Sequence, residues 1–259
     1  MEMPKVSSSP YMNMDVVNKA SQNSVIGGAA EKMTVSGAVT KTAALSGVVA
    51  VCALAPQLFG LTTGVSSGLA IVCGIAAIAM VIAMVFNQKI AKYIAVPYAV
   101  CEGLFISGLV LSVNAYYPGV ALQALLATIA LLAAVSIAYK TGMIKVNAVF
   151  MSAFKIMSFG FIGLLVLNII TMFVFKDLGH QLFSLTGSGF IGIGITLFLL
   201  AYGSFSLVLD IATAEQGELS GADKDFEWYC AVSFLITVVY IYIQMLRLFV
   251  QIAATMNRD

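Results

Sequence analysis

Five long stretches of this chain contain no Asp, Glu, Lys or Arg, and they constrain the fold more than any other feature. They run over residues 42–88, 103–139, 156–175, 181–209 and 228–246. A helix that crosses a membrane needs about 20 consecutive apolar residues. The two longest stretches can each hold two crossings, because turn signals interrupt them at 60–68 and 114–119. The sequence therefore predicts seven spans, over 42–61, 69–87, 94–113, 119–139, 154–175, 187–209 and 228–250.

The composition excludes most soluble functions. Apolar residues make up 61% of the chain and charged residues only 10%, against about 45–50% and 25% in soluble domains. A core of this size cannot cover so many apolar side chains. The net charge of +1 leaves no basic surface for nucleic acid. Unbroken apolar runs also differ from the alternating segments of a β-barrel. We therefore expect an all-α integral membrane protein, a seven-transmembrane-helix bundle in a lipid bilayer, with no nucleic-acid partner.

The ends of the chain and its basic residues predict domains and orientation. Residues 1–34 are polar and hold no apolar run, so we expect a mobile tail there and a membrane domain over 35–255. No cleavable signal sequence is visible. Ten of the thirteen Lys and Arg residues fall on one side of the predicted membrane, and basic residues collect on the cytoplasmic side. The N-terminus is therefore expected in the cytoplasm and the C-terminus outside, in a cytoplasmic membrane.

Glu102 is the strongest candidate for function, because it lies inside the predicted third span. An ionised side chain at the centre of a membrane helix costs about 2.5–3.5 kcal/mol even on the lenient insertion scale. A helix keeps such a residue where it faces a polar cavity or a partner. Glu102 is thus expected to line an ion pathway, and the alternative is a protonated carboxyl that bonds neighbouring helices together.

Asp210 is the second candidate, at the expected cytoplasmic end of the sixth span. Five further acids follow it in an expected cytoplasmic loop, and carboxylates of this kind suit hard cations such as Ca²⁺. The loop lacks the spacing of a dedicated calcium loop, so we expect either a solvated segment or a diffuse cation-attracting mouth. These acids are Glu215, Glu218, Asp223, Asp225 and Glu227.

The other polar and reactive residues favour structural roles. Arg247, near the end of the last span, is interpreted as a structural anchor. The four cysteines lie apart in the sequence and form no metal or redox motif. The glycine pattern at 187–192 has neither the strand nor the acid of a dinucleotide site. His180, the only histidine, is expected in a solvated outer loop. No catalytic set can be assembled, so we expect a protein that is not an enzyme.

Several short motifs, in order along the seven spans, resemble those of the Bax inhibitor-1 family, and of its bacterial branch in particular. The resemblance covers about residues 33–250. Its carriers are Met33-Thr34-Val35, Lys41-Thr42-Ala43, Glu102-Gly103-Leu104, Tyr117-Pro118-Gly119, Tyr139-Lys140-Thr141-Gly142, Leu207-Val208-Leu209-Asp210, Glu215-Gln216-Gly217, Glu227-Trp228-Tyr229 and Leu246-Arg247-Leu248.

The resemblance implies a bundle whose last helix is central and wrapped by the other six. Family members are associated with a pH-sensitive leak of Ca²⁺, gated by a pair of aspartates. Asp210 matches the first aspartate, and Glu102 matches the glutamate of span three. The second aspartate falls near Thr237, and no acid occurs between Glu227 and Asp259. The two-aspartate gate is therefore incomplete in this chain.

These observations predict a cation leak channel, with Ca²⁺ as the expected ion and carboxylate protonation as its control. Glu102 would line the pathway and Asp210 would control its cytoplasmic end. No cofactor is expected beyond weakly bound Ca²⁺. The alternative is an interaction protein, because some bacterial family members are linked to membrane-anchored proteases, and the polar tail could serve such a contact.

Overall fold

The computed structural model describes residues 32–59, 63–174 and 189–256, and seven helices in this part are long and apolar enough to cross a membrane. This confirms the number of spans predicted from the charge-free stretches. The described residues form no strand. The helices, with the short 3-10 helix η1 before α4, are α2 (Val35–Leu58), α3 (Thr63–Phe86), η1 (Gln88–Ile90), α4 (Ala91–Tyr116), α5 (Val120–Lys140), α6 (Ala148–Val174), α8 (Gly189–Leu219) and α9 (Phe226–Met256).

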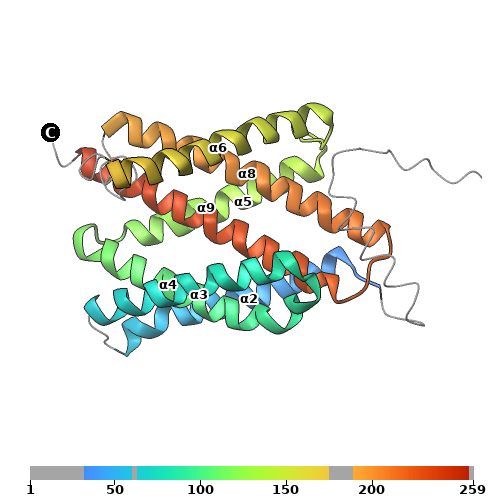
Figure 1. Cartoon of the computed structure of the whole chain (residues 1–259), viewed down its shortest axis with the longest axis horizontal. Coiled ribbons are helices and arrows are strands. Elements are labelled where there is room, and N and C mark those ends of the chain that lie inside the picture. Colours follow the sequence, from blue (N-terminus) through green and yellow to red (C-terminus); the bar gives the residue numbers. More distant parts are fainter. Residues whose placement is uncertain (1–31, 60–62, 175–188, 257–259) are drawn as a thin grey trace, which may run out of the picture.

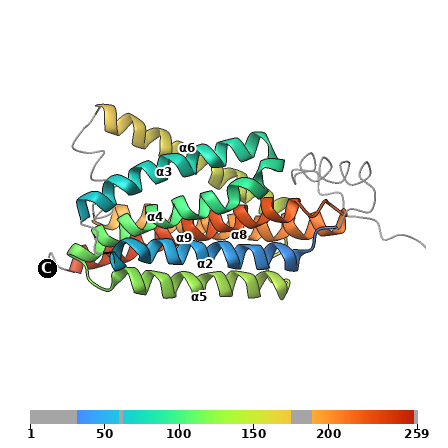
Figure 2. The same cartoon turned by 90° about the horizontal axis from the view of Figure 1, so that it is seen from below.

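Helix α9 is the centre of the bundle. In its most apolar window 67% of the residues are buried, against at most 39% in any other span. It packs against α2, α4, α5 and α8, while α3 packs on α4 and α6 packs on α8 at the periphery (Figures 1 and 2). The two outer helices expose many apolar side chains, as helices that face lipid do. The central last helix implied by the resemblance is confirmed.

Several helices extend further than the charge-free stretches predicted. Helix α2 begins at Val35 rather than at 42, and α8 continues to Leu219 rather than ending at 209. The added turns carry polar and charged side chains, because a helix does not have to end where the apolar run ends. The expected turn at 60–68 is shorter than predicted, since α3 already begins at Thr63. The turn after α4 is confined to 117–119, where Gly119 adopts a positive φ of 83°.

The predicted tail is partly folded. Met33 is almost completely buried, and its backbone N–H donates to the Ala222 carbonyl at 2.9 Å. Lys32 forms an isolated antiparallel bridge with Asp223. The folded domain therefore begins at residue 32 or earlier. The rest of the predicted tail, 1–31, lies outside the described residues.

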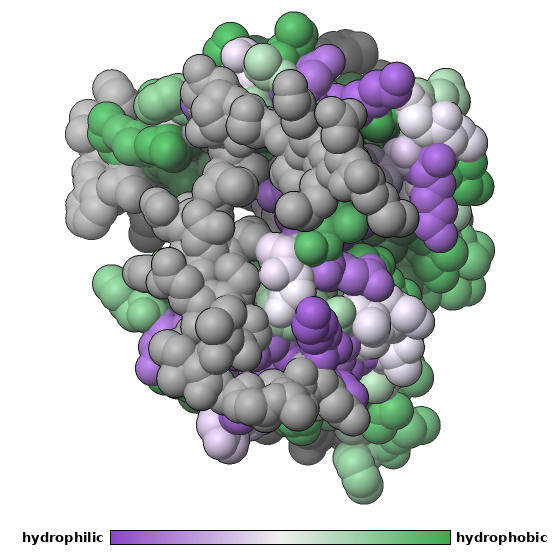
Figure 3. Space-filling view, turned by 90° about the vertical axis from the view of Figure 1, so that its right-hand side faces the viewer, coloured by the Kyte–Doolittle hydropathy of each residue, from purple (hydrophilic) through white to green (hydrophobic). Residues whose placement is uncertain are grey.

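The charges of the described residues gather at one end of the bundle, which we call the charged end. It holds the starts of α2, α4, α6 and α9 and the ends of α3, α5 and α8. Figure 3 views this end and shows hydrophilic side chains across it, with hydrophobic side chains toward the rim. Among the described residues, the Asp, Glu, Lys and Arg side chains that lie deeper in the helices are Glu102, Asp210 and Arg247.

Candidate functional site

Asp210 is held between α8 and the central helix by two hydroxyl groups. Ser233 Oγ donates to Asp210 Oδ1 at 2.7 Å, and Thr237 Oγ1 donates to Asp210 Oδ2 at 2.5 Å. Ser233 and Thr237 are four residues apart on α9 and therefore project from the same face of that helix. Both oxygens of the carboxylate thus have a donor. We call these three residues the Asp210 clamp.

The clamp lies deeper than the sequence predicted. Asp210 was expected at the end of its span, but α8 continues for nine residues beyond it, to Leu219. Asp210 has two hydroxyl donors but forms no salt bridge within the described residues. Thr237 occupies the position where the resemblance implies a second aspartate, and its hydroxyl contacts Asp210.

Glu102 lies on α4, on the other side of the central helix. Tyr98 lies one helical turn earlier on the same helix. The salt bridge of 2.5 Å between Lys92 and Asp225 places the starts of α4 and α9 at one level. Counted from there, Glu102 and Thr237 both lie about 15–18 Å into the bundle at 1.5 Å per residue. The two predicted pathway carboxylates are thus at similar depth, but α9 packs against both of their helices, and the structure shows no hydrogen bond or salt bridge between them within the described residues.

The backbone around Glu102 is tightly packed. A Cβ added at Gly103 would lie 2.6 Å from both Cys52 Cβ and the Val49 carbonyl oxygen of α2. Only glycine allows α2 and α4 to approach this closely. Glu102 is therefore presented from a segment of α4 whose position is fixed by its neighbour.

Glu227 belongs to the fold of the charged end and not to an open loop. The residue is 2% exposed. Its Oε2 forms a salt bridge of 2.7 Å with Lys41 Nζ, and its Oε1 accepts from the backbone N–H of Thr34 at 2.9 Å. The ammonium group of Lys41 also lies 4.7 Å from the centre of the Trp228 ring. A buried carboxylate on α9 therefore fixes the start of α2.

The first turn of α2 receives further acceptors. Thr34 Oγ1 accepts from the Gly37 N–H at 3.0 Å, in the manner of a helix N-cap. Glu218 Oε2 accepts from the Val35 N–H at 3.1 Å. Free N–H groups and the helix dipole both favour carboxylates at this position. Two of the five predicted cation-attracting acids therefore cap a helix.

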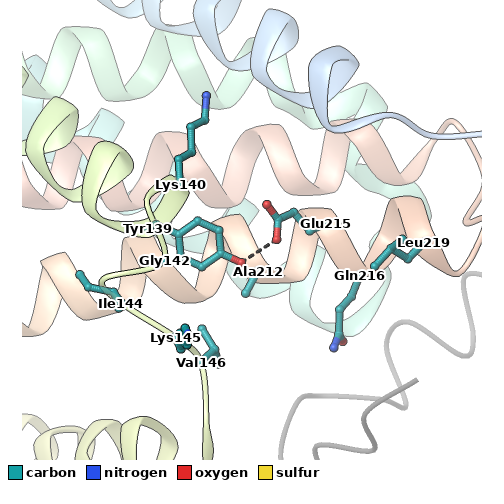
Figure 4. Close-up of a pocket in the computed structure, with 10 residues that line it drawn as sticks. All are labelled: Tyr139, Lys140, Gly142, Ile144, Lys145, Val146, Ala212, Glu215, Gln216 and Leu219. Carbon is teal, nitrogen blue, oxygen red and sulfur yellow. Dashed lines mark hydrogen bonds between the residues drawn. The ribbon is translucent and has the colours of Figure 1, made fainter. Parts of the chain in front are cut away.

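The remaining acids of this set have separate surroundings. Tyr139 donates to Glu215 Oε2 at 2.6 Å, at the wall of a cleft of about 460 Å³ between the ends of α5 and α8 (Figure 4). Asp225 pairs with Lys92, and Asp223 is bridged to Lys32 through its backbone. Only Asp223 and Asp225 lie between helices. Within the described residues no group of three or more His, Cys, Asp or Glu could hold a metal ion.

Arg247 takes part in a second buried polar cluster, near the far end of α9. When the Gln251 amide is oriented so that both its polar atoms have partners, its oxygen accepts from Arg247 Nε at 3.1 Å. Its nitrogen then donates to Thr196 Oγ1 of α8 at 2.9 Å. Thr196, Arg247 and Gln251 are all buried. The anchoring role predicted for Arg247 fits this cluster, but Gln251 and Thr196 were not foreseen, although the polar residues of the last span recur every three or four positions.

The other motifs stay apart from these clusters. All four cysteines are free thiols. The segment 189–192 of the glycine pattern is part of α8, and the residues before it, like His180, lie outside the described residues.

One comparison with known proteins gives a match. The family model described as Bax inhibitor 1 like matches residues 9–254, nearly the whole chain. No curated protein and no solved structure matches it.

Proposed function

Because the chain belongs to the Bax inhibitor 1 like family, we propose that it is a cation leak channel of a cytoplasmic membrane, with Ca²⁺ as its ion. The observation that carries this proposal is the Asp210 clamp, a carboxylate inside the bundle with two hydroxyl donors and no positive partner among the described residues. A negative charge that is not neutralised by the protein attracts a cation or a proton.

In this proposal the clamp is the closed contact between α8 and α9. Hydrogen bonds to a charged acceptor are about twice as strong as those between neutral groups. The ionised carboxylate therefore holds α8 against the central helix, and a proton or a cation on Asp210 weakens the contact. Glu102 lines the pathway on the α4 side, where its charge favours cations. The proposal includes no enzymatic activity and no resident cofactor.

The test is Ca²⁺ flux through purified protein in liposomes. Asp210→Asn keeps the shape of the clamp but removes its charge, so we expect flux to rise severalfold. Glu102→Gln removes a charge from the pathway, so flux should fall. Asp225→Asn, an exposed acid outside the clamp, is the matched control and should leave flux unchanged.

Equal flux in the native protein and both variants would overturn the roles of Asp210 and Glu102, and no flux above that of protein-free liposomes would overturn the channel. Flux that appears only when a second membrane protein is present would instead support the alternative role, in which the chain modulates a membrane-anchored protease.

The same assay across a pH series tests control by protonation. Thr237→Asp would place a second carboxylate against Asp210, and two carboxylates in contact cannot both ionise easily. A steep pH response should therefore appear in Thr237→Asp and disappear when Asp210→Asn is added. A response that survives without Asp210 would show that the two positions are not coupled.

A further inference from the structure

The polar side chains of the central helix follow one line. From Ser233 to Gln251 they recur at alternating steps of four and three residues, which keeps them on one face of a helix. Between 231 and 253 the only polar residue off this line is Tyr242. The line is about 27 Å long at 1.5 Å per residue, close to the thickness of about 30 Å of a bilayer core. This α9 polar stripe consists of Ser233, Thr237, Tyr240, Gln244, Arg247 and Gln251.

The stripe faces α8 along its length. Its first part holds Asp210, and its last part holds Thr196. Between them, the Tyr240 hydroxyl donates to the Leu199 carbonyl at 3.2 Å. A Cβ at Gly203 would lie 3.0 Å from Tyr240 Cδ1, so α8 and α9 are in close contact at this level. Polar partners on α8 therefore match the stripe at both ends and near the middle.

Gln244 is the gap in this arrangement. It lies seven residues after Thr237 and seven before Gln251, so it points toward α8 as they do. The residue is only 9% exposed, and no described group bonds its Oε1. A buried acceptor without a partner is costly, and more so where lipid replaces water outside the protein. Buried waters commonly satisfy such groups when polar side chains surround them.

We propose that the α8–α9 interface binds internal water at Gln244, between the Tyr240 contact and the Thr196–Gln251 cluster. The water site does not depend on the proposed function. The water site itself is tested without measuring flux.

The first test measures how fast a small water-soluble thiol reagent labels a cysteine at this position. In a background with Cys52, Cys73, Cys101 and Cys230 replaced by serine, Gln244→Cys is compared with Met245→Cys. Met245 is the matched control, since it lies at the same depth and is 8% exposed but belongs to the apolar core. Labelling followed by mass spectrometry should be at least about tenfold faster at 244, because the reactive thiolate forms in a hydrated site and not in an apolar one. Equal rates would overturn the proposal.

The second test uses the native background and does not depend on the cysteine variants folding. Gln244→Met keeps the size of the side chain but removes both polar atoms. If Gln244 were dry and unpaired, this change would raise the melting temperature, because it removes an unsatisfied group. If water is bound there, the change removes water contacts as well, and the melting temperature should stay the same or fall. A clear rise would overturn the proposal.

Discussion

Asp210 and Glu227 are two carboxylates with similar partners and different charge environments. Each accepts hydrogen bonds from another part of the bundle: Asp210 from Ser233 and Thr237 of α9, and Glu227 from Thr34, just before α2. Glu227 also has the ammonium group of Lys41 at 2.7 Å, whereas Asp210 has only hydroxyls. Both carboxylates join two helices. Asp210 joins α8 to α9, and Glu227 joins α9 to the start of α2.

The difference shows which carboxylate can respond to its surroundings. The charge of Glu227 is neutralised inside the protein, so it contributes to the stability of the charged end and has little reason to take up a proton or cation. The charge of Asp210 is not neutralised, so its contacts depend on what else binds there. The comparison predicts that Glu227 contributes mainly to stability, and under the proposed function it is Asp210 that controls flux.

The largest effect on stability is expected for Glu227→Ala. Breaking a buried ion pair by removing one partner costs about 3–5 kcal/mol, and the Thr34 N–H loses its acceptor as well. Asp225→Ala breaks an exposed pair with Lys92 and should cost only about 0.2–1 kcal/mol. Denaturant unfolding in detergent measures both. Similar losses of unfolding free energy in the two variants would show that the buried Glu227 pair contributes no more to stability than an exposed pair.

A smaller loss is expected for Thr237→Val, which keeps the shape of the side chain and removes one donor from Asp210. Hydrogen bonds to charged groups contribute about 1.5–3 kcal/mol. Thr213→Val on α8 is the matched control, since Thr213 Oγ1 donates only to the Leu209 carbonyl of its own helix, at 2.8 Å. If both variants unfold alike, the clamp contributes nothing specific to the contact between α8 and α9.

The smallest of the three losses is expected for Gly37→Ala, on the Glu227 side of the comparison. A Cβ at Gly37 would lie 2.4 Å from Glu227 Oε1, so the carboxylate must shift. Overpacking of this kind typically costs about 1–3 kcal/mol. At Gly47, on the same helix, nothing lies within 4 Å, and alanine should stabilise by roughly 0.5–1 kcal/mol. A gain in melting temperature for both variants would mean that the Glu227 contact is loose.

The number of helices could be predicted from the charge-free stretches, because a membrane-spanning helix needs about 20 apolar residues. The central position of α9 followed only from the resemblance. The ends of the helices could not be predicted. Thr34 is a local N-cap before Val35, but the other acceptors at the start of α2, Glu218 and Glu227, lie more than 180 residues further along the chain. Local patterns hold no trace of these two partners.

The candidate site could also be predicted only in part. The resemblance placed Thr237 opposite Asp210, and the structure has the two in contact. Glu227 was grouped with loop acids, since its burial depends on Lys41, 186 positions away. The spacing of Gln244 and Gln251 is visible in the sequence, but a neutral amide in an apolar span does not by itself indicate a site, because its burial is much less costly than that of a charge.

The capping of α2 by distant acids also bears on how the protein is made. The first helix of the described residues, α2, has donors at its N-terminal turn whose partners are Glu218 and Glu227, so they are satisfied only after residues 218–227 have been added. Until then α2 can enter the membrane, but its start has no fixed partner. A chain that stops before α9 therefore lacks the carboxylate that pairs with Lys41 and accepts from the Thr34 N–H, and it leaves the start of α2 without these contacts.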